Sequence, residues 1–345
     1  MMDIKNLVRP NIISLVPFSS ARAEFDGVAD VLLDANENPY DNGINRYPDP
    51  YQRELKTQIS EWKGIHPQNI FLGNGSDEII DYIIRTFCRP GLDRIRYIYP
   101  SFGMYKVMAD INDIGSIQIQ LDANFDFDAT DALADQTEAD KILFLCSPNN
   151  PTANSYDHDK IISCIEGFNG LVVVDEAYID FSTKATCIPL IEKHKNLIVL
   201  QTFSKALGAA GLRIGMAFAN PEILKYMTKV KAPYNIGSQT QNRALEVLGD
   251  LERIKQENRS IIAERKTLRE ELRAISAVEL VHDSDANFLL VKFTNPMKIM
   301  SYLRDLKIIV RDRSKLPHCE GCLRITVGTA IENLRLIEAL RKYRA

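Results

Sequence analysis

Short apolar runs alternate with longer amphipathic stretches between Ile70 and Ala219. The runs are rich in β-branched residues and predict buried strands, whereas the stretches between them carry apolar residues at helical spacing. The predicted strands are residues 70–73, 94–99, 116–121, 141–146, 171–175, 197–202 and 214–219. This alternation is typical of a mostly parallel α/β sheet covered by helices on both faces. Ligands of such sheets bind beyond the carboxyl ends of the strands, so the polar residues there are the first candidates for a site.

The pattern changes after Pro221. Residues 222–231 and 238–276 predict helices that link two domains, and the longer stretch carries charged residues at the spacing of a solvated helix face. Beyond residue 278, strand-like runs at 287–293, 308–311 and 323–327 have helices between and after them. We therefore expect a large α/β domain followed by a smaller α+β domain, which suits a length of 345 residues.

Composition and charge narrow the class of protein. Hydrophobic residues make up 45% of the chain and charged residues 26%, which is ordinary for a globular protein. The net charge is −4 and like charges do not cluster, so we expect no nucleic-acid partner. No apolar run approaches the length of a membrane span, and charges interrupt the first 22 residues. The prediction is a cytoplasmic protein with no membrane partner.

The six cysteines are spread along the chain, at Cys88, Cys146, Cys164, Cys187, Cys319 and Cys322. Without a secretory signal, reduced thiols are the expectation. The last two form one Cys-x-x-Cys pair beside His318, but no second pair completes a zinc site. We predict no metal site and structural or incidental thiols.

Lys205 follows the apolar run at 197–202, and Arg213 comes eight residues later. A lysine held against apolar surface loses hydration, which lowers its pKa and leaves a neutral amine able to form a Schiff base with an aldehyde. The arginine could hold an anion on the same molecule. Taken alone, Lys205 proves little, because most lysines are solvated surface groups.

Asp175 ends the run at 171–175, and Tyr178 comes three residues later. A buried carboxylate needs a partner, and a protonated pyridine nitrogen would serve, since the ion pair keeps the ring electron-withdrawing. The tyrosine could donate a hydrogen bond to an oxygen on the same ring. The alternative is an aspartate that caps the next helix.

Further candidates for ligand binding lie at other strand ends, and each of those discussed first could also have a purely structural role. Two prolines flank Asn150 and aim its amide, although Asn and Pro are also common turn residues. Gly75 precedes a predicted helix at 78–88, whose free N–H groups suit a phosphate, although Ser76 or Asp77 could simply cap that helix. Phe102 could stack on a planar ligand or belong to the core. Thr202 and Ser204 offer hydroxyl groups to the same phosphate.

The order and spacing of these residues resemble the fold-type I enzymes dependent on pyridoxal 5′-phosphate (PLP), in particular the aminotransferase family. The flanking motifs are similar to those of histidinol-phosphate aminotransferases nearly end to end. They are Leu-Asp-Ala-Asn-Glu-Asn-Pro at 33–39, Arg-Tyr-Pro at 46–48, Pro-Ser-Phe-Gly-Met-Tyr at 100–105, Cys-Ser-Pro-Asn-Asn-Pro-Thr at 146–152, Val-Arg-Asp at 310–312 and Gly-Cys-Leu-Arg-Ile-Thr-Val-Gly-Thr at 321–329.

The resemblance implies a seven-stranded, mostly parallel sheet in a large PLP-binding domain at 41–235 and a small C-terminal domain at 236–345. Residues 1–40 would form an arm that packs on the small domain and on the partner of an obligate homodimer. The two active sites would be shared, with Tyr47 reaching the cofactor phosphate of the second subunit. The reaction implied is reversible amino transfer between L-histidinol phosphate and glutamate, with imidazole-acetol phosphate and 2-oxoglutarate as the keto partners.

The same resemblance implies a role for each candidate. Lys205 would bind the cofactor aldehyde and act as general base, Asp175 would pair with the pyridine nitrogen, Tyr178 and Asn150 would contact the ring oxygen, and Phe102 would stack on the ring. The cofactor phosphate would meet Gly75, Ser76, Asp77, Thr202, Ser204 and Arg213. Arg324 would bind the carboxylate of glutamate and, with Arg311, the phosphate of histidinol phosphate, while Asn36 would lie beside the substrate.

Within this fold, an aromatic amino-acid aminotransferase and a threonine-phosphate decarboxylase remain alternatives. Outside it, a cofactor-binding regulator would need a helix-turn-helix extension, and an inactive scaffold would not need Lys205 and Asp175. The sequence departs from the family pattern at Ala153, where glycine is usual, at Phe102, where tyrosine or tryptophan is commoner, and at Phe18, where relatives often have tyrosine.

Overall fold

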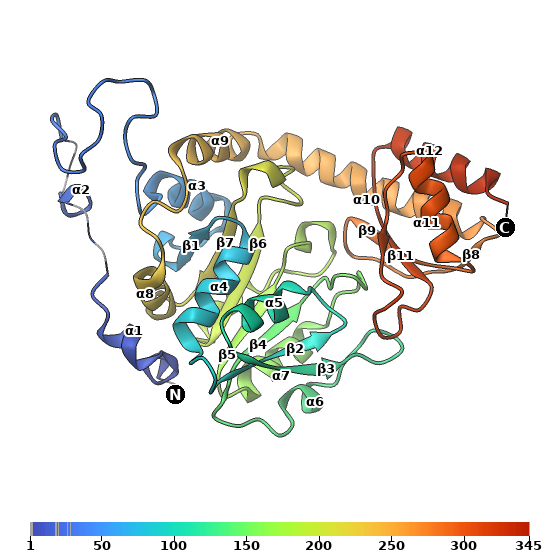
Figure 1. The fold of residues 1–345 in the computed structure, drawn as a ribbon, viewed down its shortest axis with the longest axis horizontal. Helices are drawn as coiled ribbons and strands as arrows, with labels where there is room; N and C mark the ends of the chain where they lie inside the picture. The colour runs from blue at the N-terminus through green and yellow to red at the C-terminus, as the bar shows by residue number, and fades with distance from the viewer. Residues whose placement is uncertain (1–2, 18, 20, 26, 28, 345) are drawn as a thin grey trace.

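The computed structural model describes residues 3–17, 19, 21–25, 27 and 29–344. Phe18, one of the positions singled out above, lies outside the described residues. A seven-stranded sheet forms the centre of the larger part (Figure 1). Its order is β1 (Ile70–Gly73), β7 (Gly215–Ala219), β6 (Leu197–Thr202), β5 (Leu171–Asp175), β4 (Asp140–Cys146), β2 (Arg94–Tyr99) and β3 (Gly115–Gln120).

The sheet is mostly parallel, as the sequence predicts. β3, β2, β4, β5 and β6 run parallel to one another, whereas β7 is antiparallel to both of its neighbours, β6 and β1. Strands β1, β2, β5 and β6 have the predicted bounds, and the other three differ by one residue at one or both ends. The fold class is therefore confirmed: apolar runs between amphipathic stretches form a sheet covered on both faces.

Alternate side chains of the central strands enter two separate cores. In β5, Val172 and Val174 belong to one core, and Leu171 and Val173 belong to the other. The first core is completed by α3 (Arg53–Lys63), α6 (Ala129–Leu133), α7 (His158–Gly167) and α9 (Ser238–Leu248), and the second by α1 (Pro10–Ser14), α4 (Ser76–Phe87), α5 (Met104–Ile111) and α8 (Pro221–Val230). A strand buried on both sides has no polar alternation, which is why these runs are continuously apolar.

The smaller part contains a four-stranded antiparallel sheet. Its order is β10 (Arg311–Asp312), β11 (Cys322–Thr326), β9 (Phe288–Phe293) and β8 (Val278–Val281), and its core includes side chains from α10 (Leu251–Arg273), α11 (Pro296–Asp305) and α12 (Ala330–Lys342). The long helix α10 runs from the large part to this sheet (Figure 1). The proposed domain limits at 40/41 and 235/236 stay a prediction.

Two expectations for this region are corrected. The helical stretch at 238–276 divides into α9 and α10, because Gly249 and Asp250 separate them and Asp250 leaves the helical conformation, at φ −123°. The run at 308–311 forms only the two-residue strand β10, because Ile308 and Val310 pack against the core without a paired strand. The strand β8 was not predicted.

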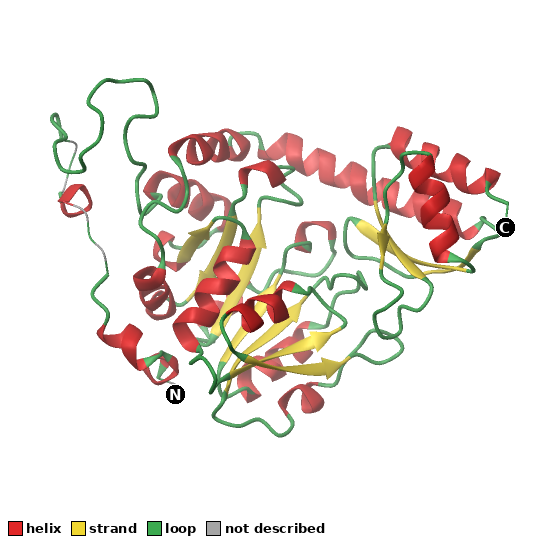
Figure 2. Cartoon of the chain, in the orientation of Figure 1, coloured by secondary structure: helices red, strands yellow, loops and turns green. Residues whose placement is uncertain are grey.

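η1 (Ile4–Leu7) and α1 pack against the second core, where Ile4 and Ile12 are buried. The described residues between α1 and α3, called the arm from here on, extend away from the body of the molecule, mostly as loop on either side of the short α2 (Ala21–Glu24) (Figure 2). Val16, Leu33, Tyr40 and Ile44 in this arm are largely exposed. The remaining short helices are η2 (Pro67–Asn69), η3 (Ile179–Phe181), η4 (Ile188–Glu192) and η5 (Ala210–Leu212). Of the helices in the described residues, none is both long and apolar enough to cross a membrane.

Candidate active site

Three neighbouring strands of the large sheet end at one pocket. β4, β5 and β6 are adjacent and parallel, so their carboxyl ends, at Cys146, Asp175 and Thr202, lie side by side. The start of α4 and the loops after β2 and β6 complete the wall. The pocket is lined by Ser76, Asp77, Phe102, Cys146, Asn150, Asp175, Ala177, Tyr178, Thr202, Ser204, Lys205 and Arg213. Sheet topology thus brings together most of the residues that the sequence singled out.

Lys205 lines this pocket and is exposed to solvent, although protein atoms partly desolvate its ammonium group. Desolvation and the nearby positive charges of Arg324 and Arg213 lower its pKa, and the carboxylate of Asp175 opposes them. The Lys205 Nζ lies 5.5 Å from the centre of the Tyr178 ring. A lysine with a lowered pKa has a larger fraction of neutral amine, the form that attacks carbonyl carbon and accepts protons.

Asp175 is buried at the end of β5, with 3% of its surface exposed. Burial raises the pKa of its carboxyl group, while two hydrogen bonds favour the charged form. The Tyr105 hydroxyl donates to Oδ2 at 2.7 Å, and the Ala177 N–H donates to Oδ1 at 3.1 Å. Tyr105 is itself held by a stacked contact with Phe144, at 4.6 Å between ring centres. Asp175 is therefore oriented but not neutralised, which leaves a place for a cation.

The first turn of α4 faces Arg213. Gly75 is the residue before Ser76 at the helix start; it has φ +84° and provides no side-chain cap, so the first N–H groups stay open to a ligand. A Cβ atom at Gly75 would lie 2.6 Å from Arg213 Nη2. Arg213 Nη1 donates weakly to Ser204 Oγ at 3.4 Å, and Nη2 lies 3.6 Å from Asp77 Oδ2. This is the geometry of an anion cradle.

The small domain contributes Arg324 to the same site. Its Nη1 donates to Asn150 Oδ1 at 2.5 Å, and its guanidinium carbon lies 5.3 Å from the centre of the Phe288 ring. Arg311 is the register partner of Arg324 across β10 and β11. The Arg324–Asn150 hydrogen bond joins two residues 174 positions apart, so the contact between domains closes one wall of the site.

Not every predicted residue is brought to this pocket. Tyr47 and Asn36 belong to the extended arm, and neither they nor Arg311 are among the lining residues. Tyr47 stacks on Tyr234 at 4.4 Å between ring centres and is 50% exposed. Asn36 has a positive φ of 54°. A contribution from Tyr47 to a second subunit stays a prediction.

Sequence reasoning missed Tyr105, Cys146 and Ala177. Tyr105 touches Asp175. It comes three residues after Phe102, in the turn that leads into α5, and this spacing could have suggested that it faces the same strand ends. Cys146 is simply the last residue of β4. Ala153, where the family usually has glycine, has φ +69°, a conformation that glycine adopts without strain.

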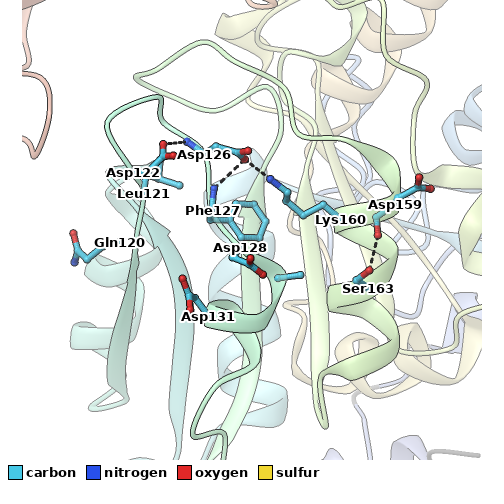
Figure 3. Close-up of a pocket in the computed structure, with 11 residues that line it drawn as sticks. Gln120, Leu121, Asp122, Asp126, Phe127, Asp128, Asp131, Asp159, Lys160 and Ser163 are labelled. Carbon is cyan, nitrogen blue, oxygen red and sulfur yellow. Dashed lines mark hydrogen bonds and ion pairs between the residues drawn. The ribbon is translucent and has the colours of Figure 1, made fainter.

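A second and wider pocket lies elsewhere on the large domain, between the loop after β3 and helices α6 and α7 (Figure 3). Asp122, Asp126, Asp128, Asp131 and Asp159 are among its lining residues, with Lys160 paired to Asp126. Asp122 accepts a hydrogen bond from the N–H group of Asp126 (Figure 3) and another from the N–H group of Asn124. It shares no lining residue with the first pocket, and the carboxylates of Asp122 and Asp128 accept hydrogen bonds from nearby backbone N–H groups.

The cysteine thiols are not placed to act as nucleophiles or metal ligands. All six cysteines are free and buried, and burial raises the pKa of Cys319 to about 12 and of Cys322 to about 11. Thiols with raised pKa values are poor nucleophiles and poor metal ligands at neutral pH. In the described part of the chain, no three His, Cys, Asp or Glu residues are placed to hold a metal ion together.

A domain with this sheet, a desolvated lysine after β6 and a carboxylate at the end of β5 defines an aminotransferase-like fold, and comparison with known proteins agrees. The sequence profile of the family "Aminotransferase class I and II" matches residues 15–340, so the chain belongs to that family.

Within this family, the chain is similar over its full length to histidinol-phosphate aminotransferases. The chain is 49% identical over 341 residues to the histidinol-phosphate aminotransferase of Parabacteroides distasonis, covering 99% of both sequences. It is 48% identical over 342 residues to that of Christiangramia forsetii, covering 99% of this chain and 98% of the relative. Its fold is similar to the crystal structure of histidinol-phosphate aminotransferase from Sinorhizobium meliloti in complex with pyridoxal 5′-phosphate, with a TM-score of 0.80, 22% identity, and coverage of 86% and 82% of the two chains.

Proposed function

We propose that this chain is a PLP-dependent histidinol-phosphate aminotransferase of L-histidine biosynthesis. It would transfer an amino group reversibly between L-histidinol phosphate and 2-oxoglutarate, giving imidazole-acetol phosphate and glutamate. The observation that carries the proposal is the full-length similarity to enzymes of that name, together with one pocket that joins Lys205, Asp175 and Arg213.

The residues present fit PLP. The cofactor has a pyridine nitrogen that can be protonated, an aldehyde and a phosphate. Asp175 is a buried carboxylate with no ion pair within 4.0 Å among the described residues, which suits a ring cation. The space at Gly75, which a Cβ atom would fill, and the guanidinium of Arg213 suit the phosphate. Bound PLP supplies an aldehyde that condenses with amines and a ring that withdraws electrons from the carbon losing a proton.

Lys205 performs the proton transfers in this proposal. Its lowered pKa makes the neutral amine available, so Nζ would act as the general base that takes the proton from the substrate Cα and, once protonated, as the general acid that returns it. Asp175 keeps the ring nitrogen protonated throughout. The raised pKa of Tyr178, caused mainly by burial, keeps its hydroxyl protonated as a hydrogen-bond donor to the ring oxygen.

Arg324 and Arg311 bind the charged end of each substrate. A guanidinium group offers the same forked pair of N–H donors to a carboxylate and to a phosphate. One pocket can therefore receive glutamate in one half-reaction and L-histidinol phosphate in the other. Asn150 holds Arg324 in place and is within reach of the ring oxygen in this proposal.

The proposal includes a homodimer in the cytoplasm. Tyr47 lies outside the pocket of its own chain, and the arm that carries it exposes several large apolar side chains that a second subunit would cover. A Tyr47 from each protomer would then complete the phosphate site of its partner. Sedimentation equilibrium checks the oligomeric state, and a monomer at micromolar concentration would contradict this part.

The main test is a spectral titration of the PLP-loaded enzyme. Absorbance of the bound cofactor should shift on addition of glutamate and return on addition of 2-oxoglutarate. In a separate titration of the PLP-loaded enzyme, L-histidinol phosphate should cause the same shift as glutamate. Turnover of L-phenylalanine and O-phospho-L-threonine, measured beside it, separates the alternatives of the same fold. A decisive preference for phosphate-free aromatic substrates would refute the narrower assignment.

Substitution of Lys205 tests the mechanism. Lys205→Ala should slow the glutamate half-reaction by about 100-fold or more, which is typical for loss of a general base. The matched control is Lys193→Ala, an exposed lysine in the same domain. Normal half-reaction rates in Lys205→Ala would exclude the proton-transfer role.

A further inference from the structure

A third arginine, Arg313, joins Arg311 and Arg324 on one face of the small sheet. Arg311 is directly opposite Arg324, and the Arg313 N–H donates to the Cys322 carbonyl at 3.0 Å, so the pairing continues past the end of β10. Because side chains alternate along a strand, Arg311, Arg313 and Arg324 project to the same side. The neighbours Leu323 and Ile325 project to the other side, into the small-domain core.

These three guanidinium groups have no acidic partner. In the part of the chain that the structure describes, no carboxylate lies within 4.0 Å of any of them. Arg324 donates to a neutral amide oxygen of Asn150, and the buried Nε of Arg313 has no hydrogen-bond partner. Unpaired cations held close together repel one another, so the cluster favours an anion between them.

Arg313 is not among the residues that line the first pocket, but its charge acts on the other two arginines and on a residue of that pocket. Burial, together with the charges of Arg324 and Arg311, lowers its pKa to about 10. Its positive charge also acts on the phenol of Tyr178, which lines the pocket. Arg313 is half-buried, in contrast to the exposed Lys315 two residues later.

The two substrates of the proposed reaction differ in the anion that they present here. A carboxylate has one charge and two oxygens, which one guanidinium fork satisfies. A phosphate monoester has up to two charges and three free oxygens, so additional donors improve its binding but not that of a carboxylate. A third arginine is therefore more than glutamate requires.

We propose that Arg313 is a specificity-determining residue that binds the substrate phosphate together with Arg311 and Arg324 and favours the phosphorylated amine over the dicarboxylic amino acid. This inference rests on the proposed function and deepens it. Arg313 has no part in proton transfer.

Single-turnover rates of the PLP-loaded enzyme test this role. In Arg313→Gln, kcat/KM for L-histidinol phosphate should fall about 10-fold to 100-fold, as expected for a lost hydrogen bond between charged groups, and the glutamate half-reaction should change less than about threefold. Arg313→Lys should recover part of the loss, since it retains the charge but not the fork. The control is Lys315→Gln, which removes an exposed charge nearby. Equal losses for both substrates, or a loss for neither, would overturn the proposal.

Inhibition by inorganic phosphate separates this inference from the proposed function. Phosphate should compete with substrate in the wild type, and its inhibition constant should rise by a similar factor in Arg313→Gln but not in Lys315→Gln. If the wild type fails to use L-histidinol phosphate yet this difference remains, the proposed reaction fails and the phosphate site stands. If phosphate inhibits both forms equally, Arg313 is not a phosphate ligand. Melting temperatures of the variants show whether each is folded.

Discussion

The Tyr105 hydroxyl lies 2.7 Å from Asp175 Oδ2 and donates a hydrogen bond to it. The two residues come from α5 and from the end of β5, and Tyr105 is completely buried. A hydrogen bond to a charged carboxylate is worth about 1.5–3 kcal/mol. It favours the ionised form of Asp175 against the effect of burial.

Removal of this hydroxyl should weaken the ionised state of Asp175. In Tyr105→Phe we expect the pKa of Asp175 to rise further, and cofactor affinity to fall about tenfold or more near neutral pH. The loss should grow as the pH falls, because more of the carboxyl is then protonated. Equilibrium titration of the apoenzyme with PLP from pH 8 to pH 5.5 measures it. Tyr99→Phe, at a half-buried tyrosine that does not line the pocket, is the control, and a pH-independent effect would contradict the explanation.

The buried Asp175 carboxylate should lower the stability of the folded apoprotein. The pKa of its carboxyl is raised in the folded apoprotein, so the ionised form is disfavoured by folding. Asp175→Asn should therefore raise the melting temperature of the apoenzyme at pH 7 by roughly 1–3 °C. The gain should shrink as the pH falls towards the ordinary pKa of aspartate, where the wild-type carboxyl is protonated in both states.

The same variant should lose far more in catalysis than in cofactor binding. We expect the glutamate half-reaction of Asp175→Asn to slow by about 100-fold or more, because the ring nitrogen is no longer kept protonated. Asp159→Asn, at an exposed site in the second pocket, serves as the control. A half-reaction at the wild-type rate would show that Asp175 does not pair with the ring.

Gly75 should be intolerant of a side chain. Gly75→Ala places a Cβ atom 2.6 Å from Arg213 Nη2 at a residue with φ +84°, so both the cradle and the backbone must shift. We expect PLP affinity to fall about tenfold to a hundredfold. Gly237→Ala is the matched control, since a Cβ atom there meets nothing within 4 Å. Equal PLP affinity in the two variants would show that the close approach has no bearing on phosphate binding.

Glu37 organises the arm that carries Tyr47. Its Oε2 accepts from Arg22 and Arg46, each at 2.8 Å, and its Oε1 accepts from the Tyr47 N–H at 2.6 Å. The Arg22 hydrogen bond, with those of Tyr47 and Arg46, lowers the pKa of Glu37 to about 2. Because this pKa is depressed, the stabilisation is present above the ordinary value of 4.5 and is lost only as the pH falls towards 2.

Neutralisation of this carboxylate should loosen the arm at every pH above that range. In Glu37→Gln we expect limited proteolysis within residues 15–47 to be about tenfold faster at pH 7. Glu24→Gln, at an exposed glutamate of α2, is the control. The wild-type rate should stay constant between pH 8 and pH 5 for a pH-insensitive protease, and a marked rise within that range would contradict the depressed pKa.

The pattern of apolar and polar residues along the chain was enough to predict the large sheet and the residues at its strand ends. A strand buried on both faces must be continuously apolar, and the first polar residue after it, such as Asp175, marks the edge where ligands bind. Lys205 could be selected in the same way, because it follows the end of β6 by three residues, and Arg213 could be selected by its spacing of eight residues from Lys205. The bounds of the short strand β10 could not be predicted in this way. Ile308 and Val310 are apolar because they pack against the small-domain core, and not because they belong to a paired strand.

The hydrogen-bond partners of the site residues could not be predicted from the local sequence, because they come from distant parts of the chain. Tyr105 and Asp175 are 70 positions apart, and Arg324 and Asn150 are 174 apart. Arg313 shares a face with Arg324 only through the register of β10 and β11. Charge and hydrophobicity along the chain select which residues can act at a site. Strand order, register and the packing of two domains set the distances between them, because those depend on residues far away in the sequence.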